Sequence, residues 1–105
     1  MIKKFHIEMP LSFEDSFDLL CKSGNDIMSW KINKSDLKNG YIEWKQSFFS
    51  LTGSATIIAL LERTEEEETS VDIAVQKPLQ FMDPLGICDK VFHKLDKAWQ
   101  TNLKK

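Results

Sequence analysis

Apolar and polar residues alternate with a period of two in several stretches of the chain, a pattern typical of β-strands with one face in a core. The first stretch runs from Lys3 to Met9 and ends at Pro10. Similar alternation occurs in residues 28–33, 42–48 and 71–76. Residues 54–63 are apolar on both faces, which predicts a central or covered strand. Together these segments predict five strands.

Two turns connect the predicted strands. Asn39 and Gly40 supply residues that readily adopt a positive φ, so we expect a tight antiparallel hairpin there. The run of four glutamates from Glu65 to Glu68 repels itself and favours a solvated turn. No internal repeat interrupts this order.

Two segments have the spacing of amphipathic helices. In the first, Ser12 is the predicted N-cap, Asp15 follows three residues later, and Gly24 is the expected C-terminal stop. The second is longer and opens at Asp83 and Pro84, a residue pair that favours a helix start. Its apolar face is predicted to contain Val91, Phe92, Leu95 and Trp99, and its opposite, solvated face Lys90, Lys94 and Lys97.

The predicted order of elements is β-α-β-β-β-β-α, which is an α+β fold. We expect one domain over residues 1–105, because a chain of this length supports one core of two layers. A curved antiparallel sheet would pack on the long C-terminal helix. The residues expected on its inner face are Phe5, Ile7, Trp44, Phe48, Ile57, Leu61, Ile73 and Val75.

Charge and hydropathy exclude some classes of partner. The chain has 14 basic and 16 acidic residues, which argues against nucleic acid or an anionic membrane surface as the main partner. Its longest uncharged stretch, residues 46–61, is shorter than the roughly 20 residues that span a bilayer. The N-terminal residues lack the continuous apolar run of a signal peptide. We therefore expect a cytoplasmic protein without a membrane span.

Catalytic and metal-binding motifs are not evident. Cys21 and Cys88 are predicted to be apolar core residues, and two lone thiols are typical of a reducing compartment. His6 and His93 are expected at the surface, with no metal-ligand spacing between them. Residues 51–54 indicate a bend rather than a phosphate-binding loop. We therefore expect no metal and no cofactor, and an enzyme is less favoured than a binding protein.

The segment from Pro10 to Leu20, a strand-ending proline followed by a helix, precedes a run of antiparallel strands and a long C-terminal helix. This order resembles a shortened START-like, or Bet v 1-like (SRPBCC), domain. The resemblance implies a curved sheet around the terminal helix and a cavity for lipids, sterols, polyketides or other apolar molecules, and some members act as cochaperones or cyclases. Members usually have six or seven strands, and a shorter sheet encloses less volume.

The aromatic residues are the main candidates for ligand binding. Either they fill the core, or part of their surface lines a small apolar pocket between the sheet and the helix. Polar groups expected near its mouth are Tyr41, Gln46 and Thr56. The function predicted first is therefore non-catalytic binding of an apolar or lipid-like small molecule. Its candidate residues are Trp30, Trp44, Phe48, Phe92 and Trp99.

A second hypothesis concerns the outer face of the sheet. Ile58 and Leu60 form a contiguous apolar strand patch there, which suggests a protein partner or a second copy of the chain. In the alternative, Phe13 and Phe17 or the residues after Phe49 cover the patch within one molecule. The function predicted second is a protein-interaction or homodimerising module.

Overall fold

The computed structural model describes residues 1–47, 53–77 and 86–105. Within these ranges five strands and two helices follow one another in the predicted order, so the predicted α+β class is confirmed. The elements are β1 (Ile2–Met9), α1 (Phe13–Asn25), β2 (Trp30–Asp36), β3 (Tyr41–Gln46), β4 (Ala55–Glu65), β5 (Glu68–Gln76) and α2 (Ile87–Leu103). The predicted helix start at Asp83 and Pro84 lies outside the described residues.

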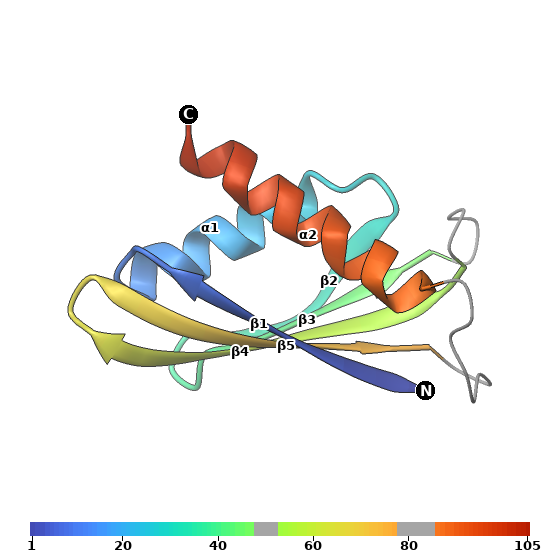
Figure 1. Cartoon of the computed structure of the whole chain (residues 1–105), viewed down its shortest axis with the longest axis horizontal. Helices are drawn as coiled ribbons and strands as arrows, with labels where there is room; N and C mark the ends of the chain where they lie inside the picture. Colours follow the sequence, from blue (N-terminus) through green and yellow to red (C-terminus); the bar gives the residue numbers. More distant parts are fainter. Residues whose placement is uncertain (48–52, 78–85) are drawn as a thin grey trace.

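The five strands form one antiparallel sheet in the order β1-β5-β4-β3-β2. The first strand therefore pairs with the last, and β4 is the central strand, as its two apolar faces predict. Both helices lie on the same face of the sheet (Figure 1). This arrangement gives the sheet an inner face covered by helices and an outer face without one in the described structure.

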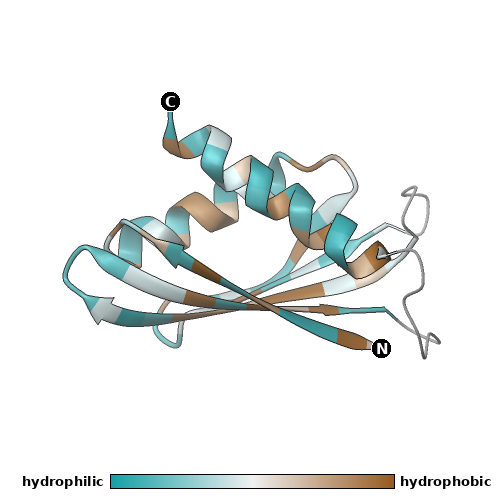
Figure 2. Cartoon of the chain, in the orientation of Figure 1, coloured by the Kyte–Doolittle hydropathy of each residue, from teal (hydrophilic) through white to brown (hydrophobic). Residues whose placement is uncertain are grey.

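Alternation along the strands separates these two faces. Ile57, Ala59 and Leu61 of β4 are buried on the inner face, whereas Ile58 is half-buried and Leu60 is exposed on the outer face. The β4–β5 turn, which contains the glutamate run, is hydrophilic, and apolar residues recur in the middle of the strands (Figure 2). Completely buried side chains of the sheet include Ile42, Trp44, Val71 and Val75.

The predicted N-cap and hairpin turn are both present. The Oγ of Ser12 accepts a hydrogen bond from the backbone N–H of Asp15 at 3.2 Å, which satisfies one of the free donors at the start of α1. Gly40 has a φ of 64°, and its N–H donates to the carbonyl of Leu37 at 3.3 Å. A side chain at Gly40 would also approach the Leu61 carbonyl to 2.6 Å. Glycine therefore suits this turn for both conformational and steric reasons.

Gly24 does not end α1, contrary to the sequence-based expectation. The helix continues to Asn25, and Gly24 is buried within it. The reason for the glycine is packing rather than capping, because a Cβ at this position would lie 2.2 Å from Nε1 of Trp44. The absent side chain allows α1 to approach the Trp44 indole on β3 closely.

The start of β2 also differs from the prediction. Met28 was expected to alternate with Trp30 as an inward strand residue, but it is completely exposed, and β2 begins at Trp30. The N–H of Trp30 instead donates to the carbonyl of Ile27 at 3.0 Å, so the chain between α1 and β2 forms a turn. A local turn therefore replaces the expected strand at Met28, while the Ser29 carbonyl still accepts a hydrogen bond from the N–H of Ser47 at 2.7 Å.

We predict that Gly24→Ala destabilises the fold even though alanine normally favours a helix interior over glycine. The added methyl group would clash with Trp44, and such overpacking costs about 3 kcal/mol. Urea denaturation followed by circular dichroism measures the change. Lys22→Ala, an exposed change in the same helix, is the control and should alter the free energy of unfolding by less than about 0.5 kcal/mol. An equal effect of the two substitutions would contradict this account.

Candidate functional site

Tryptophans line the region between the sheet and the helices. Trp30, Trp44 and Trp99 retain 6%, 0% and 7% of their surface exposure. The rings of Trp30 and Trp44 are 5.6 Å apart between centroids and tilted by 42°, so β2 and β3 together present an aromatic wall. Of the predicted ligand-binding residues, Phe48 lies outside the described residues.

Phe92 and Trp99 approach this region from α2. Phe92 stacks on Phe5 of β1 with the ring centroids 4.3 Å apart and the planes parallel within 1°. Trp99 lies about two helical turns further along α2, and its Nε1 donates to Asp96 at 3.0 Å. The structure therefore brings Trp30 and Trp44 together and places Phe92 beside β1, while Trp99 lies near the other end of the helix.

A polar group stands at the edge of the aromatic wall. Gln46, at the end of β3, is 3% exposed, and its Oε1 accepts hydrogen bonds from Trp30 Nε1 at 2.8 Å and from Lys94 Nζ at 3.0 Å. Its Nε2 donates to the carbonyl of Gly53. These bonds orient the amide and hold a buried polar side chain between sheet and helix, where unsatisfied groups would be costly.

Lys94 does not lie on the solvated face of α2, where the sequence analysis placed it. Its side chain is half-buried and turns toward Gln46, whereas Lys90 and Lys97 are exposed. Burial lowers the pKa of Lys94, and the positive charge of Lys77 lowers it further. The helical period alone could not reveal this contact, because it depends on the position of β3 beneath α2.

Lys77 follows β5 and is also turned into the structure. It is only 4% exposed, and its Nζ donates to the carbonyl of Ser54 at 2.8 Å. Lysine is seldom buried in proteins unless its charge is compensated or used. Sequence reasoning missed Lys77, although the alternation of Val71, Ile73 and Val75 continues to it and so predicts an inward side chain.

Tyr41 and Thr56, the other polar groups expected near a pocket mouth, lie on the outer face of the sheet. The hydroxyl of Tyr41 donates to Glu43 at 2.7 Å, and Thr56 accepts from Lys45 at 2.9 Å. The bond to Glu43 raises the pKa of Tyr41. Successive side chains of a strand point to opposite faces of the sheet. Tyr41 and Gln46 are an odd number of residues apart in β3, so Tyr41 lies on the outer face and Gln46 on the inner face.

The outer face carries a shallow hollow of about 280 Å³ over the central strands. Leu60 is 50% exposed beside it, and Ile58 and Ala74 are half-buried cross-strand partners. Phe17 belongs to the core cluster and Phe13 packs against it, so α1 leaves Leu60 exposed. The residues that line the hollow are Lys4, Phe5, Ile58, Leu60, Asp72 and Ala74.

His6 lies between two carboxylates on this outer face. Its Nδ1 is 2.8 Å from Asp72 and its Nε2 is 2.5 Å from Glu8. Hydrogen bonding to Asp72, and then to Glu8, raises the pKa of His6. The predicted surface position of His6 is confirmed, but its acidic neighbour from β5 could not be seen from local spacing.

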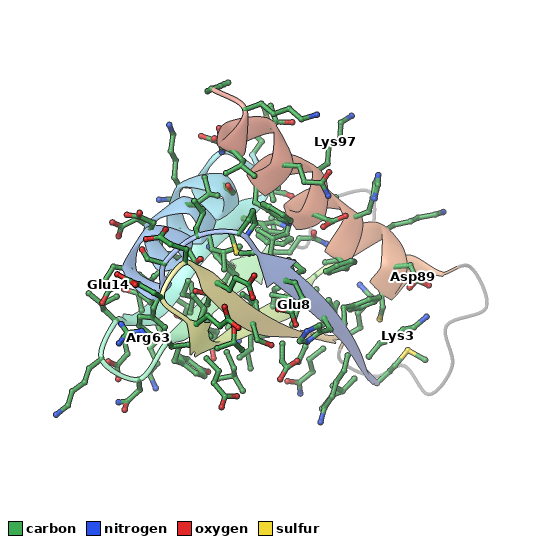
Figure 3. All side chains as sticks on the ribbon, turned by 60° about the vertical axis from the view of Figure 1, so that its left-hand side comes forward. Lys3, Glu8, Glu14, Arg63, Asp89 and Lys97 are labelled. Atoms are coloured by element: carbon green, nitrogen blue, oxygen red, sulfur yellow. The ribbon has the colours of Figure 1, made fainter. Side chains whose placement is uncertain are left out.

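Exposed ion pairs connect the helices to the sheet at two places (Figure 3). Lys3 of β1 pairs with Asp89 of α2 at 2.8 Å, and Glu14 of α1 pairs with Arg63 of β4 at 2.8 Å. Such pairs contribute less than about 1 kcal/mol each. They orient the helix ends and do not dominate the stability of the fold.

The described residues do not favour a metal-binding site or a reactive cysteine. Among them, no group of three or more His, Cys, Asp or Glu side chains could hold a metal ion. Cys88 is buried, and burial raises the pKa of the half-buried Cys21 thiol, which disfavours the reactive thiolate. In the same part of the chain, neither helix has the length and apolar character needed to cross a bilayer.

Several solved structures share this arrangement. The di-domain ARO/CYC protein BexL from the BE-7585A biosynthetic pathway matches with a TM-score of 0.70 and 10% identity over 99% of this chain. Ara h 8.0201 gives a TM-score of 0.63 and 11% identity, covering 95% of this chain and 94% of its own. The chain has a Bet v 1-like fold.

The ZhuI aromatase/cyclase from Streptomyces sp. R1128 has a similar structure. It matches with a TM-score of 0.61 and 9% identity, and the match covers 93% of this chain and 87% of that one. The chain spans only 46% of the length of the di-domain BexL. The sequence matches no family model and no curated protein. At these identities the likeness shows the fold, and residues of the relatives cannot be transferred to this chain.

We predict that His6 makes stability depend on pH. Because its folded-state pKa is raised above 6.5, its stabilising effect is complete below that pH and disappears as pH rises through the folded-state pKa. The urea midpoint of the natural chain should therefore exceed that of His6→Gln by more at about pH 6 than at about pH 8.5. Asp72→Asn should remove most of this pH dependence. The same difference at both pH values would show that the protonation of His6 does not contribute to the stability of the fold.

Proposed function

We propose that this Bet v 1-like domain binds a small apolar or lipid-like molecule between the sheet and α2, without transforming it chemically. The observation that carries the proposal is the buried Gln46, which bonds to Trp30 on one side and to Lys94 on the other, at the edge of an aromatic wall. Ligand sites typically combine apolar and aromatic walls with a few convergent polar groups.

The core does not require a polar residue at the position of Gln46. An apolar residue in place of Gln46 would pack against Trp30 without requiring hydrogen bonds, whereas the amide must have every polar atom satisfied. The titration of Lys94 is also perturbed there, a property that is enriched at functional sites. The aromatase/cyclase structures with the same fold favour a binding role for this layer over a purely structural one.

The complete burial of Trp44 defines how a guest must enter. Packed side chains leave no access to that indole, and Gly24 of α1 lies directly against it, so we expect binding to move the helices away from the sheet. Phe92 would lie at the helix side of the opened space and Trp30 at the sheet side. The ordering and displacement of these side chains would reduce affinity relative to a preformed pocket.

Tryptophan fluorescence and a panel of 1-decanol, sodium decanoate and Nile red test the proposal. At least one probe should produce a saturable change, because Trp30 and Trp44 border the proposed site. Phe92→Ala should weaken binding about fivefold, since it removes the aromatic surface that α2 contributes. Leu103→Ala, a truncation at the far end of the same helix, should change it less than about twofold.

The binding proposal has a clear negative outcome. If none of the three probes binds saturably to the folded chain, the proposed function is wrong. Equal weakening by Phe92→Ala and Leu103→Ala would also contradict it, because it would indicate general destabilisation of α2 rather than loss of a contact.

A second candidate function is self-association through the outer face of the sheet. The hollow beside Leu60 favours it, because a half-exposed leucine lies there at the centre of a five-stranded sheet. Lys4 and Asp72 border the same hollow, so two copies have both charges available to pair across the contact. A second copy is therefore the partner that this surface fits best.

Light scattering over a range of concentrations tests self-association. We expect the apparent mass to rise with concentration and to return to that of a monomer in Leu60→Glu, because burial of a new carboxylate opposes the contact. Leu37→Glu is the matched control, since Leu37 is 47% exposed in the β2–β3 turn. A monomer at every concentration would refute this second function.

A further inference from the structure

The outer face of the sheet separates positive from negative charge along the direction of its strands. At one end, the strand register aligns Lys31 of β2 with Lys45 of β3. At the other end, Ser70 of β5 aligns with Glu8 of β1 on one side and with Glu62 of β4 on the other. These four charged side chains are exposed. The outer face therefore has a basic end and an acidic end, and the apolar hollow lies between them.

The outer positions of β4 fix the centre of this face. Thr56, Ile58, Leu60 and Glu62 follow one another there, and successive outer positions of a strand are roughly 7 Å apart. Thr56 aligns with Lys45 at the basic end, and Glu62 marks the acidic end. The midpoint between the two ends therefore falls between Ile58 and Leu60, the two apolar residues of the series.

A hydrogen bond draws the ammonium group of Lys45 toward the central strand. Its Nζ donates to Oγ1 of Thr56 at 2.9 Å, so a side chain of β3 supplies the positive charge beside β4. Glu43 also lies in the basic half of the face, where its carboxylate accepts hydrogen bonds from Tyr41 and Asn33. The outer side of β4 consequently has a positive charge near one end and a negative charge near the other.

We propose that two copies of the chain pack outer face to outer face with their β4 strands antiparallel. This inference rests on the second candidate function and specifies how the two copies meet. A two-fold axis across the strands, midway between Ile58 and Leu60, places Ile58 of one copy against the partner's Leu60. The same axis brings Lys45 toward the partner's Glu62, and each contact forms twice. Packed sheets lie about 10 Å apart, a distance that these long side chains reach across.

The charges favour this orientation over the other symmetric one. A two-fold axis along the strands would bring each end of the face against the same end of the partner, so Glu62 would approach the partner's Glu62, and like charges in a contact repel. The antiparallel orientation also exchanges the rows of Lys4 and Asp72, which border the hollow, so these opposite charges approach each other. A protein with a surface of a single sign would match only one end of the face.

Charge reversal followed by analytical ultracentrifugation at about 50 mM salt tests the orientation. Lys45→Glu and Glu62→Lys should each weaken self-association about tenfold, because a symmetric contact converts two attractive pairs into two repulsive ones. An equimolar mixture of the two variants should associate within about threefold of the natural chain, since antiparallel packing restores opposite charges at both contacts. The double variant with both substitutions in one chain should recover self-association for the same reason.

Lys97→Glu is the matched control. Lys97 is exposed on α2, and the helices cover the face of the sheet opposite the proposed contact (Figures 1 and 3). The substitution therefore gives the chain the same net charge as Lys45→Glu but changes a residue outside the contact. It should alter the dissociation constant less than about twofold. Circular dichroism of each variant verifies that the fold is retained.

The outcomes separate this inference from the candidate function beneath it. If the natural chain is a monomer at every concentration, a second copy is not the occupant of the face, and both proposals fail. If it associates but the mixture of Lys45→Glu and Glu62→Lys stays as weak as either variant alone, self-association stands and the antiparallel orientation is wrong. Weakening by Lys97→Glu equal to that by Lys45→Glu would also overturn the orientation, because net charge alone would then control association.

Discussion

The close contact between Gly24 and Trp44 determines how the two layers of this fold meet. A helix usually stays at side-chain distance from a sheet, but here the α1 backbone approaches the indole directly because Gly24 has no side chain. Within the described residues, the Nε1 of Trp44 is the buried side-chain polar atom without a hydrogen-bond partner. Tight packing therefore takes precedence over satisfaction of that donor, and α1 covers the part of the sheet that β3 provides.

This packing leaves different surroundings for α2. Its Val91 and Leu95 are completely buried, yet one turn of the same helix presents Lys94 to Gln46. The interface consequently changes from apolar to polar within a few ångströms of Trp30. Such a boundary places polar groups in a layer that apolar side chains could fill, so each of these groups requires a hydrogen-bond partner.

Periodicity predicted most of the fold because each layer has one buried face. The alternation in β1, β3 and β5 and the 3.6-residue spacing of α2 follow directly from that constraint. The same period already placed Gln46 on the side of Trp44, although the sequence analysis grouped it with Tyr41. Contacts between distant elements, such as His6 with Asp72 or Lys94 with Gln46, depend on register and helix placement, which local spacing does not encode. The role of Gly24 was missed for the same reason.

The pairing of the first strand with the last constrains the order in which the chain can fold. β2 to β5 follow one another as neighbours, so they can form hairpins by local closure. β1 has hydrogen-bonded contacts only with β5 in the described sheet, and Ile2 aligns with Gln76. That closure spans most of the chain and carries a larger entropic cost than a hairpin. During synthesis, β1 therefore cannot pair with its neighbouring strand, and its apolar residues stay outside the sheet, until β5 has left the ribosome.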